Sequence, residues 1–431
     1  MSKIIVMSAD AMVGQDTELL KTLPNFKKYL AGGSEIKAVK SIYPTVTYPA
    51  HTTMCTGAYP ERHGIISNFP FSTKGKNLPW FWFHDAVKCD DIFSAAKRAG
   101  KTTAAVFWPV TGCHPDIDYL IDEYWSQYPG EPLDEVFTRA GSNEYALSVI
   151  AKYNDTYKDQ QRQHPGADEF IIDAACDIIR DKQPDLLMIH PANIDGYRHG
   201  KGLFGEHVDR GVYETDEWIG KLCKACEDAG VLEDTNFFLV SDHGQLEIKR
   251  SIHINVLLAD NGLIDVDSDG NVTSWRAYCT STGMSALVYL SDPEDKALYN
   301  KVYELLCHLR DEGVYGFNSF KTREETARED HLDGDFSFVL ETDGYTSFGD
   351  LAVRPLVRPC SNTDDYRFGN ATHGYHPSKG PQPILFAKGP DIKNGVVLEE
   401  SCIVHEAPTY AKIFGTELKD AQGCAIDEIL K

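Results

Sequence analysis

Short apolar runs alternate along this chain with segments of helical periodicity, and this alternation restricts the fold more than any other feature. The runs have the length of buried strands and are bounded by polar or turn residues. They lie at residues 4–7, 103–108, 185–189, 236–240 and 384–387. Strands that alternate with helices form mostly parallel sheets covered on both faces. The sequence therefore predicts a three-layer α/β/α core around a mostly parallel central sheet.

The alternation stops between about residues 250 and 365. This stretch has a helical pattern and two further strand patterns, which predict a smaller α+β unit, and its last part is rich in Gly, Asp, Pro and Arg, as loops are. These patterns lie at residues 293–311, 285–290, 336–341 and 342–370. Since the strand at 384–387 returns to the main sheet, we expect a catalytic core of residues 1–250 and 366–431. Residues 251–365 would be an insertion that shapes the substrate pocket.

The charge balance excludes several classes of partner. Among 431 residues, 42 are Lys or Arg and 65 are Asp or Glu, so the formal net charge is −23. Such a surface repels nucleic-acid polymers and anionic lipid.

No apolar stretch reaches the roughly 18 residues of a membrane span. The first apolar run is too short for a signal peptide, and the 11 cysteines are scattered. We therefore expect a cytoplasmic protein without a membrane partner.

Three aspartates follow three of the predicted strands. Asp10, Asp195 and Asp242 come shortly after the runs that end at residues 7, 189 and 240. In open α/β sheets, ligands bind beyond the carboxyl ends of the strands, so these carboxylates are expected at one edge. Clustered carboxylates repel one another unless a cation neutralises them. A lone aspartate at such a position is usually a helix cap, but three together favour a divalent metal site.

Histidines accompany these carboxylates. His199 lies four residues after Asp195, His243 is adjacent to Asp242, and His373 lies in a Gly-flanked segment after the predicted insertion. Three Asp and three His residues suit two zinc-type sites with mixed oxygen and nitrogen ligands. Two divalent ions would outweigh the three carboxylate charges, so a small anionic substrate is compatible with the acidic chain.

Thr47 is the candidate nucleophile. It precedes Pro49, and residues 49–56 predict a helix that ends at Gly57. Free backbone N–H groups at a helix N-terminus favour an anion. A hydroxyl bound there to a metal as well would lose its proton near neutral pH. An ordinary helix cap is the alternative interpretation of Thr47 taken alone.

Taken together, these motifs resemble the nucleotide pyrophosphatase/phosphodiesterase branch of the alkaline phosphatase superfamily. The stretches that carry the resemblance occur in the order of that family, at residues 10, 43–51, 56–68, 107–109, 195–199, 241–244 and 372–375. The resemblance implies an alkaline-phosphatase-like fold. It also implies a metal-dependent hydrolase that cleaves phosphodiester or phosphoanhydride bonds of small, nucleotide-type substrates through a phosphothreonine intermediate.

The resemblance also implies a role for individual residues. One zinc would be held by Asp195, His199 and His373, and the other by Asp10, Asp242, His243 and the Thr47 oxygen. Asn68 would donate a hydrogen bond to a phosphoryl oxygen. Tyr48 and Trp108 would border the substrate pocket, where Tyr48 could stack on a nucleobase.

Two positions depart from the family pattern. Arg198 stands where the family commonly has Gly, and Ala50 where it often has Asn. Neither change removes a metal ligand, and both put substrate choice in question. A phosphomonoesterase of the same superfamily is the nearest alternative, with Arg198 as the extra cation that such enzymes use for a dianionic phosphate. A non-catalytic metal-binding protein of this fold is a second alternative.

Overall fold

A computed structural model describes residues 2–74, 78–360 and 365–431. Its main body is built around an eight-stranded sheet with the strand order β19-β2-β18-β6-β1-β5-β3-β4. Every neighbouring pair is parallel except those that include β18, which is antiparallel to both β2 and β6. The mostly parallel sheet expected from the sequence is confirmed. The strands are β1 (Lys3–Ser8), β2 (Ser34–Lys40), β3 (Thr103–Val106), β4 (Tyr119–Ile121), β5 (Leu186–Ile189), β6 (Thr235–Val240), β18 (Leu385–Lys388) and β19 (Val397–Cys402).

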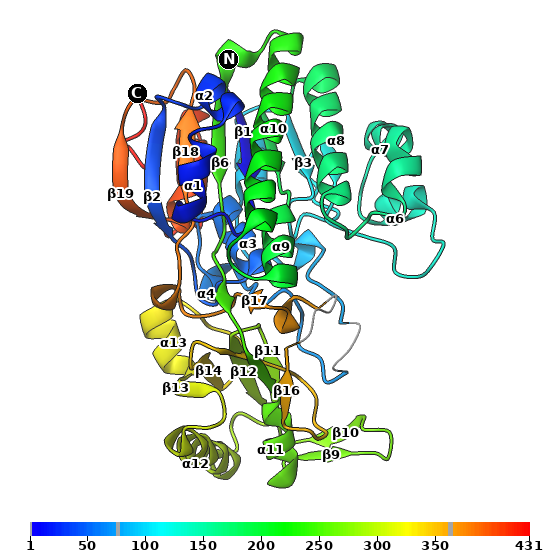
Figure 1. The fold of residues 1–431 in the computed structure, drawn as a ribbon, viewed down its shortest axis with the longest axis vertical. Coiled ribbons are helices and arrows are strands. Elements are labelled where there is room, and N and C mark those ends of the chain that lie inside the picture. Colours follow the sequence, from blue (N-terminus) through cyan, green and yellow to red (C-terminus); the bar gives the residue numbers. More distant parts are fainter. Residues whose placement is uncertain (1, 75–77, 361–364) are drawn as a thin grey trace.

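Helices cover both faces of this sheet (Figure 1). In β1, Ile5 and Met7 pack into one apolar core, whereas Ile4 and Val6 pack into the other, as the alternation of a strand requires. The first core includes side chains of α1 (Gly14–Leu20), α2 (Pro24–Tyr29), α6 (Leu133–Arg139), α7 (Glu144–Tyr157), α8 (Gly166–Lys182) and α10 (Glu206–Ala229). The second includes α3 (Thr47–Thr56), α5 (Ile92–Arg98) and α14 (Glu406–Ile413).

A smaller body lies below the large sheet in the view of Figure 1. It contains a four-stranded antiparallel sheet of order β11-β12-β14-β13. Its elements are α11 (Ile254–Asp260), β9 (Ile264–Val266), β10 (Val272–Trp275), β11 (Ala277–Ser281), β12 (Ser285–Leu290), α12 (Lys296–Glu312), β13 (Phe317–Thr322), α13 (Arg323–Asp330) and β14 (Phe338–Thr342). The strand predicted at 285–290 matches β12, and the helix predicted at 293–311 matches α12 within three residues. The predicted domain boundaries stay a prediction.

The segment expected to be loop, residues 342–370, contains two short strands. β15 (Thr346–Phe348) and β16 (Val357–Pro359) pair on either side of β8 (Arg250–Ile252). Their backbone hydrogen bonds are made with a strand almost 100 residues away, so no local pattern announces them. Residues 361–364, at the end of this segment, lie outside the described residues.

Two further helices position the site. α3 and α9 (Asn193–Lys201) lie between the centre of the large sheet and the smaller body (Figure 1). α3 ends at Gly57, whose φ of 65° is the left-handed conformation that glycine adopts most readily. The C-terminal end predicted for this helix is thus correct, and its first turn begins two residues earlier than predicted. The remaining α-helix and strands are α4 (Pro60–His63), β7 (Leu246–Glu247) and β17 (Ala371–Thr372), and five short 3-10 helices complete the described elements.

Candidate active site

The first of two Asp/His clusters joins α9 to the segment that follows β17. Asp195 and His199 lie one turn apart on α9, with His199 Nε2 3.0 Å from Asp195 Oδ2. His373 Nε2 lies 3.8 Å from Asp195 Oδ1. His199 Nδ1 donates to the Ala371 carbonyl at 2.7 Å, which leaves a lone pair on Nε2. Two acceptor atoms, His199 Nε2 and Asp195 Oδ2, therefore face each other in this cluster. A bound cation stabilises such an arrangement.

The second cluster gathers residues from two strand ends and from the start of α3. His243 Nε2 lies 3.1 Å from Asp242 Oδ2 and 3.7 Å from Asp10 Oδ1. The Thr47 hydroxyl is 3.1 Å from the same ring nitrogen. Asp10 and Asp242 follow β1 and β6, which are neighbours in the sheet, so the pairing of these strands brings their carboxylates together. The sequence-predicted ligand sets are thus assembled as two clusters.

Unpartnered buried atoms show that both clusters fit cations. Asp10 Oδ1, Asp242 Oδ2 and His199 Nε2 are buried and form no hydrogen bond within the part of the chain that the structure describes. Burial, followed by the charge of Asp195, raises the pKa of Asp10 to about 7. Burial also raises the pKa of Asp242 well above its usual range. Buried carboxylates in such surroundings are stabilised by a positive ion, and oxygen and imidazole ligands together suit zinc.

A third group, His84, Asp91 and His114, is a weaker candidate for a metal. His114 Nδ1 accepts the backbone N–H of Asp116 at 3.0 Å, so the ring proton lies on Nε2. That proton is donated to Asp91 Oδ2 at 2.9 Å, while Asp91 Oδ1 caps the N-terminus of α5. A metal at Nε2 would require the opposite tautomer. We therefore interpret this group as structural.

Thr47 and Asn68 face the same cavity from the sheet-edge side. Thr47 is the first residue of α3, so its neighbourhood includes the free N–H groups of a helix N-terminus. Asn68 Oδ1 accepts the backbone N–H of Tyr48 at 2.9 Å. This bond fixes the orientation of the amide and leaves its NH₂ group free to donate to a ligand. A hydroxyl beside a cluster that could hold a cation, together with an amide donor, suits attack on a phosphoryl group.

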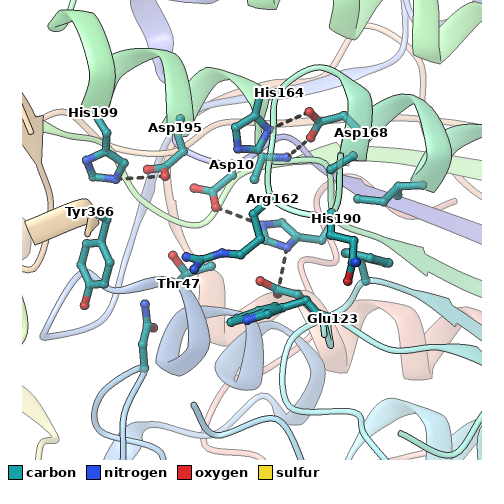
Figure 2. Close-up of a pocket in the computed structure, with 18 of the residues that line it drawn as sticks. Asp10, Thr47, Glu123, Arg162, His164, Asp168, His190, Asp195, His199 and Tyr366 are labelled. Atoms are coloured by element: carbon teal, nitrogen blue, oxygen red, sulfur yellow. Dashed lines mark hydrogen bonds and ion pairs between the residues drawn. The ribbon is translucent and has the colours of Figure 1, made fainter. Parts of the chain in front are cut away.

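The cavity has a volume of about 280 Å³ and extends well beyond the two clusters. Figure 2 shows Arg162, His164, Asp168, His190 and Glu123 around it, opposite His199 and Tyr366. Further walls come from Trp80, Phe107, Trp125 and Gln161. None of the described residues that line it belongs to 251–365. The predicted role of that segment in shaping the pocket therefore stays a prediction.

His190 supports Asp10 and was missed by sequence reasoning. Its Nε2 lies 3.0 Å from Asp10 Oδ2 and its Nδ1 lies 3.5 Å from Glu123 Oε2. Burial alone would lower the pKa of His190, but the bonds to Asp10 and Glu123 raise it well above its usual value. Its position directly after β5 was the available signal, since Asp10 and Asp242 also follow strand ends.

Three residues predicted to bind substrate lie elsewhere than expected. Tyr48 is buried beside Trp80, with ring centroids 5.1 Å apart, and Trp108 is buried against His51. The backbone at Phe107 has a φ of 57°, and at this turn Phe107 lines the cavity while Trp108 enters the core. None of the three is among the residues that line the cavity.

Arg198 is the third of the residues predicted to bind substrate, and its partners explain why it is buried. Its guanidinium forms an ion pair with Asp16 on α1 at 2.7 Å, and it also donates to the carbonyls of Ala11 and Leu203. Since Asp16 itself is buried, the pair joins α9 to α1 inside the protein. Arg198 therefore does not supply a cation to the cavity.

The α/β sheet presents two adjoining Asp/His clusters that could hold metal ions and a threonine hydroxyl at its edge, an arrangement typical of metal-dependent proteins that act on phosphoryl groups. Among such proteins, this chain belongs to the type I phosphodiesterase / nucleotide pyrophosphatase family, whose model matches residues 4–338. This family match confirms the resemblance seen in the sequence.

Curated relatives agree with this assignment. Human ectonucleotide pyrophosphatase/phosphodiesterase family member 1 is 27% identical over 251 residues, which are 55% of this chain and 23% of the relative. A Caenorhabditis elegans ectonucleotide pyrophosphatase/phosphodiesterase is 24% identical over 374 residues, 85% of this chain and 40% of the relative. The chain thus spans less than half the length of these relatives. In the described parts of the chain, no helix combines the length and apolar character needed to cross a bilayer.

Solved structures show the same fold. Murine ectonucleotide pyrophosphatase/phosphodiesterase 5, in an inactive threonine-to-alanine form in complex with AMP, matches with a TM-score of 0.67 at 18% identity. The human protein of the same name also matches with a TM-score of 0.67 at 18% identity. Each match covers 100% of both chains. The alkaline-phosphatase-like fold is confirmed, and the predicted cytoplasmic location stays a prediction.

Proposed function

We propose that this chain hydrolyses phosphodiester or phosphoanhydride bonds of small, nucleotide-type substrates, with two zinc ions as cofactors. The observation that carries the proposal is the convergence of unpartnered buried acceptor atoms beside the Thr47 hydroxyl. Asp195, His199 and His373 would hold one ion, and Asp10, Asp242, His243 and Thr47 the other. Bound there, the ions would lower the pKa of the hydroxyl and neutralise phosphoryl charge.

The residues of the chain then have defined tasks. The Thr47 oxygen forms a bond to phosphorus while the bond from phosphorus to the leaving oxygen breaks. The hydroxyl proton of Thr47 passes to water, and the leaving group departs with the electron pair of the broken bond and takes a proton from water. Asn68 donates its free NH₂ group to a phosphoryl oxygen, where charge accumulates in the transition state. Water then hydrolyses the phosphothreonine and restores Thr47.

The neighbouring structures support this assignment at two points. The murine neighbour is described as inactive when a threonine is replaced by alanine, which agrees with a threonine nucleophile. The same neighbour is in complex with AMP, which agrees with a nucleotide-type substrate. The phosphomonoesterase alternative loses its sequence argument, because the ion pair of Arg198 with Asp16 keeps this cation out of the cavity.

Side-by-side hydrolysis of three esters tests the proposal. A bis-aryl phosphodiester, an aryl nucleotide ester and an aryl phosphomonoester are each assayed with zinc and with a chelator. We expect turnover of the first two, its loss with chelator and its recovery on adding zinc. Turnover of the monoester alone would favour the phosphomonoesterase. No turnover of any ester by fully zinc-loaded protein would favour the non-catalytic alternative.

A further inference from the structure

Arg162 is a cation that neither the motifs nor the proposed mechanism uses. It is the one Lys or Arg among the described residues that line the cavity. Its guanidinium carbon lies 4.7 Å from the ring centroid of Trp125 and 5.9 Å from that of Trp80. Figure 2 shows its side chain extending toward the part of the cavity that holds Thr47 and Asp10. The two tryptophans thus keep a positive group facing the site of attack.

The turn that carries Arg162, between α7 and α8, is anchored on both sides. Gln161 Oε1 accepts the backbone N–H of Ser126 at 2.9 Å, and its Nε2 donates to Ser126 Oγ at 2.9 Å. His164 Nδ1 lies 2.7 Å from Asp168 Oδ2. His164 also lies against Gly196 of α9, where a Cβ would meet its ring at 2.3 Å. Arg162 is therefore held in position before any ligand binds.

Glu123 and Asp168, the two carboxylates drawn on the same side of the cavity as Arg162 in Figure 2, have other partners. Glu123 faces His190, and the two oxygens of Asp168 are bonded to His164 and to the Ala192 N–H. Within the described ranges, no carboxylate lies at ion-pair distance from Arg162, and Asp365, on which the charge of Arg162 also acts, pairs with Arg367 at 2.7 Å. A guanidinium beside these acids but paired with none of them is available to an anionic ligand.

We propose that Arg162 binds phosphate charge additional to that of a simple diester, so that the protein prefers substrates with more than one negative charge at the reacting end. This inference rests on the proposed function, whose substrate class it narrows. Two sources supply such charge: a phosphate that adjoins the attacked one in a phosphoanhydride, and the extra oxygen charge of a phosphomonoester. A guanidinium matches either by paired hydrogen bonds.

The test compares ATP, p-nitrophenyl phosphate and bis-p-nitrophenyl phosphate as substrates of the zinc-loaded wild-type protein and of Arg162→Gln. We expect kcat/KM for ATP, relative to the diester, to fall roughly 10- to 100-fold, since a charge-assisted contact is lost. The matched control is Arg328→Gln, an exposed arginine of α13 that pairs with Glu329. It removes the same charge and should change the ratio by less than about twofold.

The outcomes separate the two sources. A fall confined to ATP assigns Arg162 to an adjoining phosphate, and a fall confined to the monoester assigns it to the attacked group. An equal effect on all three substrates, or no effect, would overturn the inference while leaving the proposed function intact. Arg162→Lys keeps the charge but loses the planar guanidinium. Its kcat/KM for ATP relative to the diester should lie between that of wild type and that of Arg162→Gln.

A binding measurement keeps the inference testable if no substrate is turned over, an outcome that defeats the proposed function alone. Calorimetric titration of zinc-loaded protein with inorganic pyrophosphate should then show binding about tenfold weaker in Arg162→Gln than in wild type. Equal affinities would refute the role of Arg162. Zinc content and far-UV circular dichroism of each variant report on folding.

Discussion

The two sides of the cavity are built in different ways. The candidate metal-ligating side comes from the ends of β1 and β6, from α3 and α9 and from the segment after β17, and all of its candidate ligands except the partly buried Asp195 are buried. The opposite side comes from loops that carry Trp80, Trp125 and Arg162. This division resembles the general separation of roles in α/β proteins, where the sheet edge fixes the chemistry and loops select the ligand.

The sharpest test of the metal-ligating side is Thr47→Ala. Removal of the hydroxyl should lower turnover of the diester by roughly 10⁴-fold, because the covalent route is lost. Zinc content should stay close to that of wild type, since the Asp and His ligands remain. Thr47→Ser keeps a hydroxyl and should recover a large part of the rate. Retention of most activity by Thr47→Ala would exclude a phosphothreonine.

His373→Ala tests the assembly of the first cluster. Loss of one imidazole should lower zinc content from about two to about one ion per chain and turnover by roughly 10²-fold or more. Mass spectrometry of metal content gives the measurement. His376→Ala is the control variant and should keep its zinc. His376 lies on the same segment as His373, but its ring bonds to Asp330 at 3.1 Å. Full zinc occupancy in His373→Ala would refute the ligand assignment.

Arg198→Ala tests whether Arg198 stabilises the fold without affecting substrate choice, which we assign to Arg162. The substitution leaves the buried carboxylate of Asp16 unpaired, which should lower the free energy of unfolding by about 3–5 kcal/mol in urea titrations. The double variant Asp16→Leu/Arg198→Met removes both charges and should recover much of this loss. The substrate ratios that depend on Arg162 should not change with Arg198. A change in those substrate ratios without a loss of stability would show that Arg198 takes part in substrate binding.

The smallest expected effect concerns His63, which lies next to the left-handed Gly64 in the motif after α3. Its Nδ1 accepts the Ile65 N–H at 3.1 Å, its Nε2 faces the Thr53 hydroxyl at 3.0 Å, and burial lowers its pKa to about 3. Below pH 6.5 the unfolded chain therefore takes up a proton that the folded chain does not. Stability should be lost as pH falls, by about 2 kcal/mol at pH 5 from this group.

Urea unfolding of wild type and His63→Gln at pH 7 and pH 5 checks this sign. The variant should lose that part of the pH dependence, whereas His308→Gln, at an exposed position on α12, should retain it. If the free energy of unfolding of His63→Gln falls between pH 7 and pH 5 by as much as that of wild type, His63 is protonated in the folded protein.

The strands near the centre of the sheet were predictable from the sequence, and those near its margins were not. The core strands are continuous apolar runs because both of their faces are buried. β19 lies at an edge and is largely exposed, and β2 beside it mixes Glu and Lys with apolar residues, so neither shows such a run. β4 is only three residues long.

The candidate site divides in the same manner. The candidate metal ligands were predicted because the three aspartates follow strand ends, two of the histidines lie at short spacings from them, and His373 lies in a Gly-flanked segment. His190, Arg162 and the tryptophans belong to no such motif, and Arg162 reaches the cavity only because the turn before α8 is anchored to Ser126 and lies against α9. Residues from separate loops meet through packing, which local spacing does not record.

The sequence by itself determined the α/β class, the positions of the central strands along the chain and the acidic side chains that follow three of them. It did so because buried strands, helix ends and clustered carboxylates each leave a local pattern of residue types. Only the tertiary structure decided which cation enters the cavity. Arg198 is close to the ligands in sequence and pairs with a buried carboxylate, whereas Arg162 is distant in sequence and faces the site, because packing places charges by their three-dimensional neighbours.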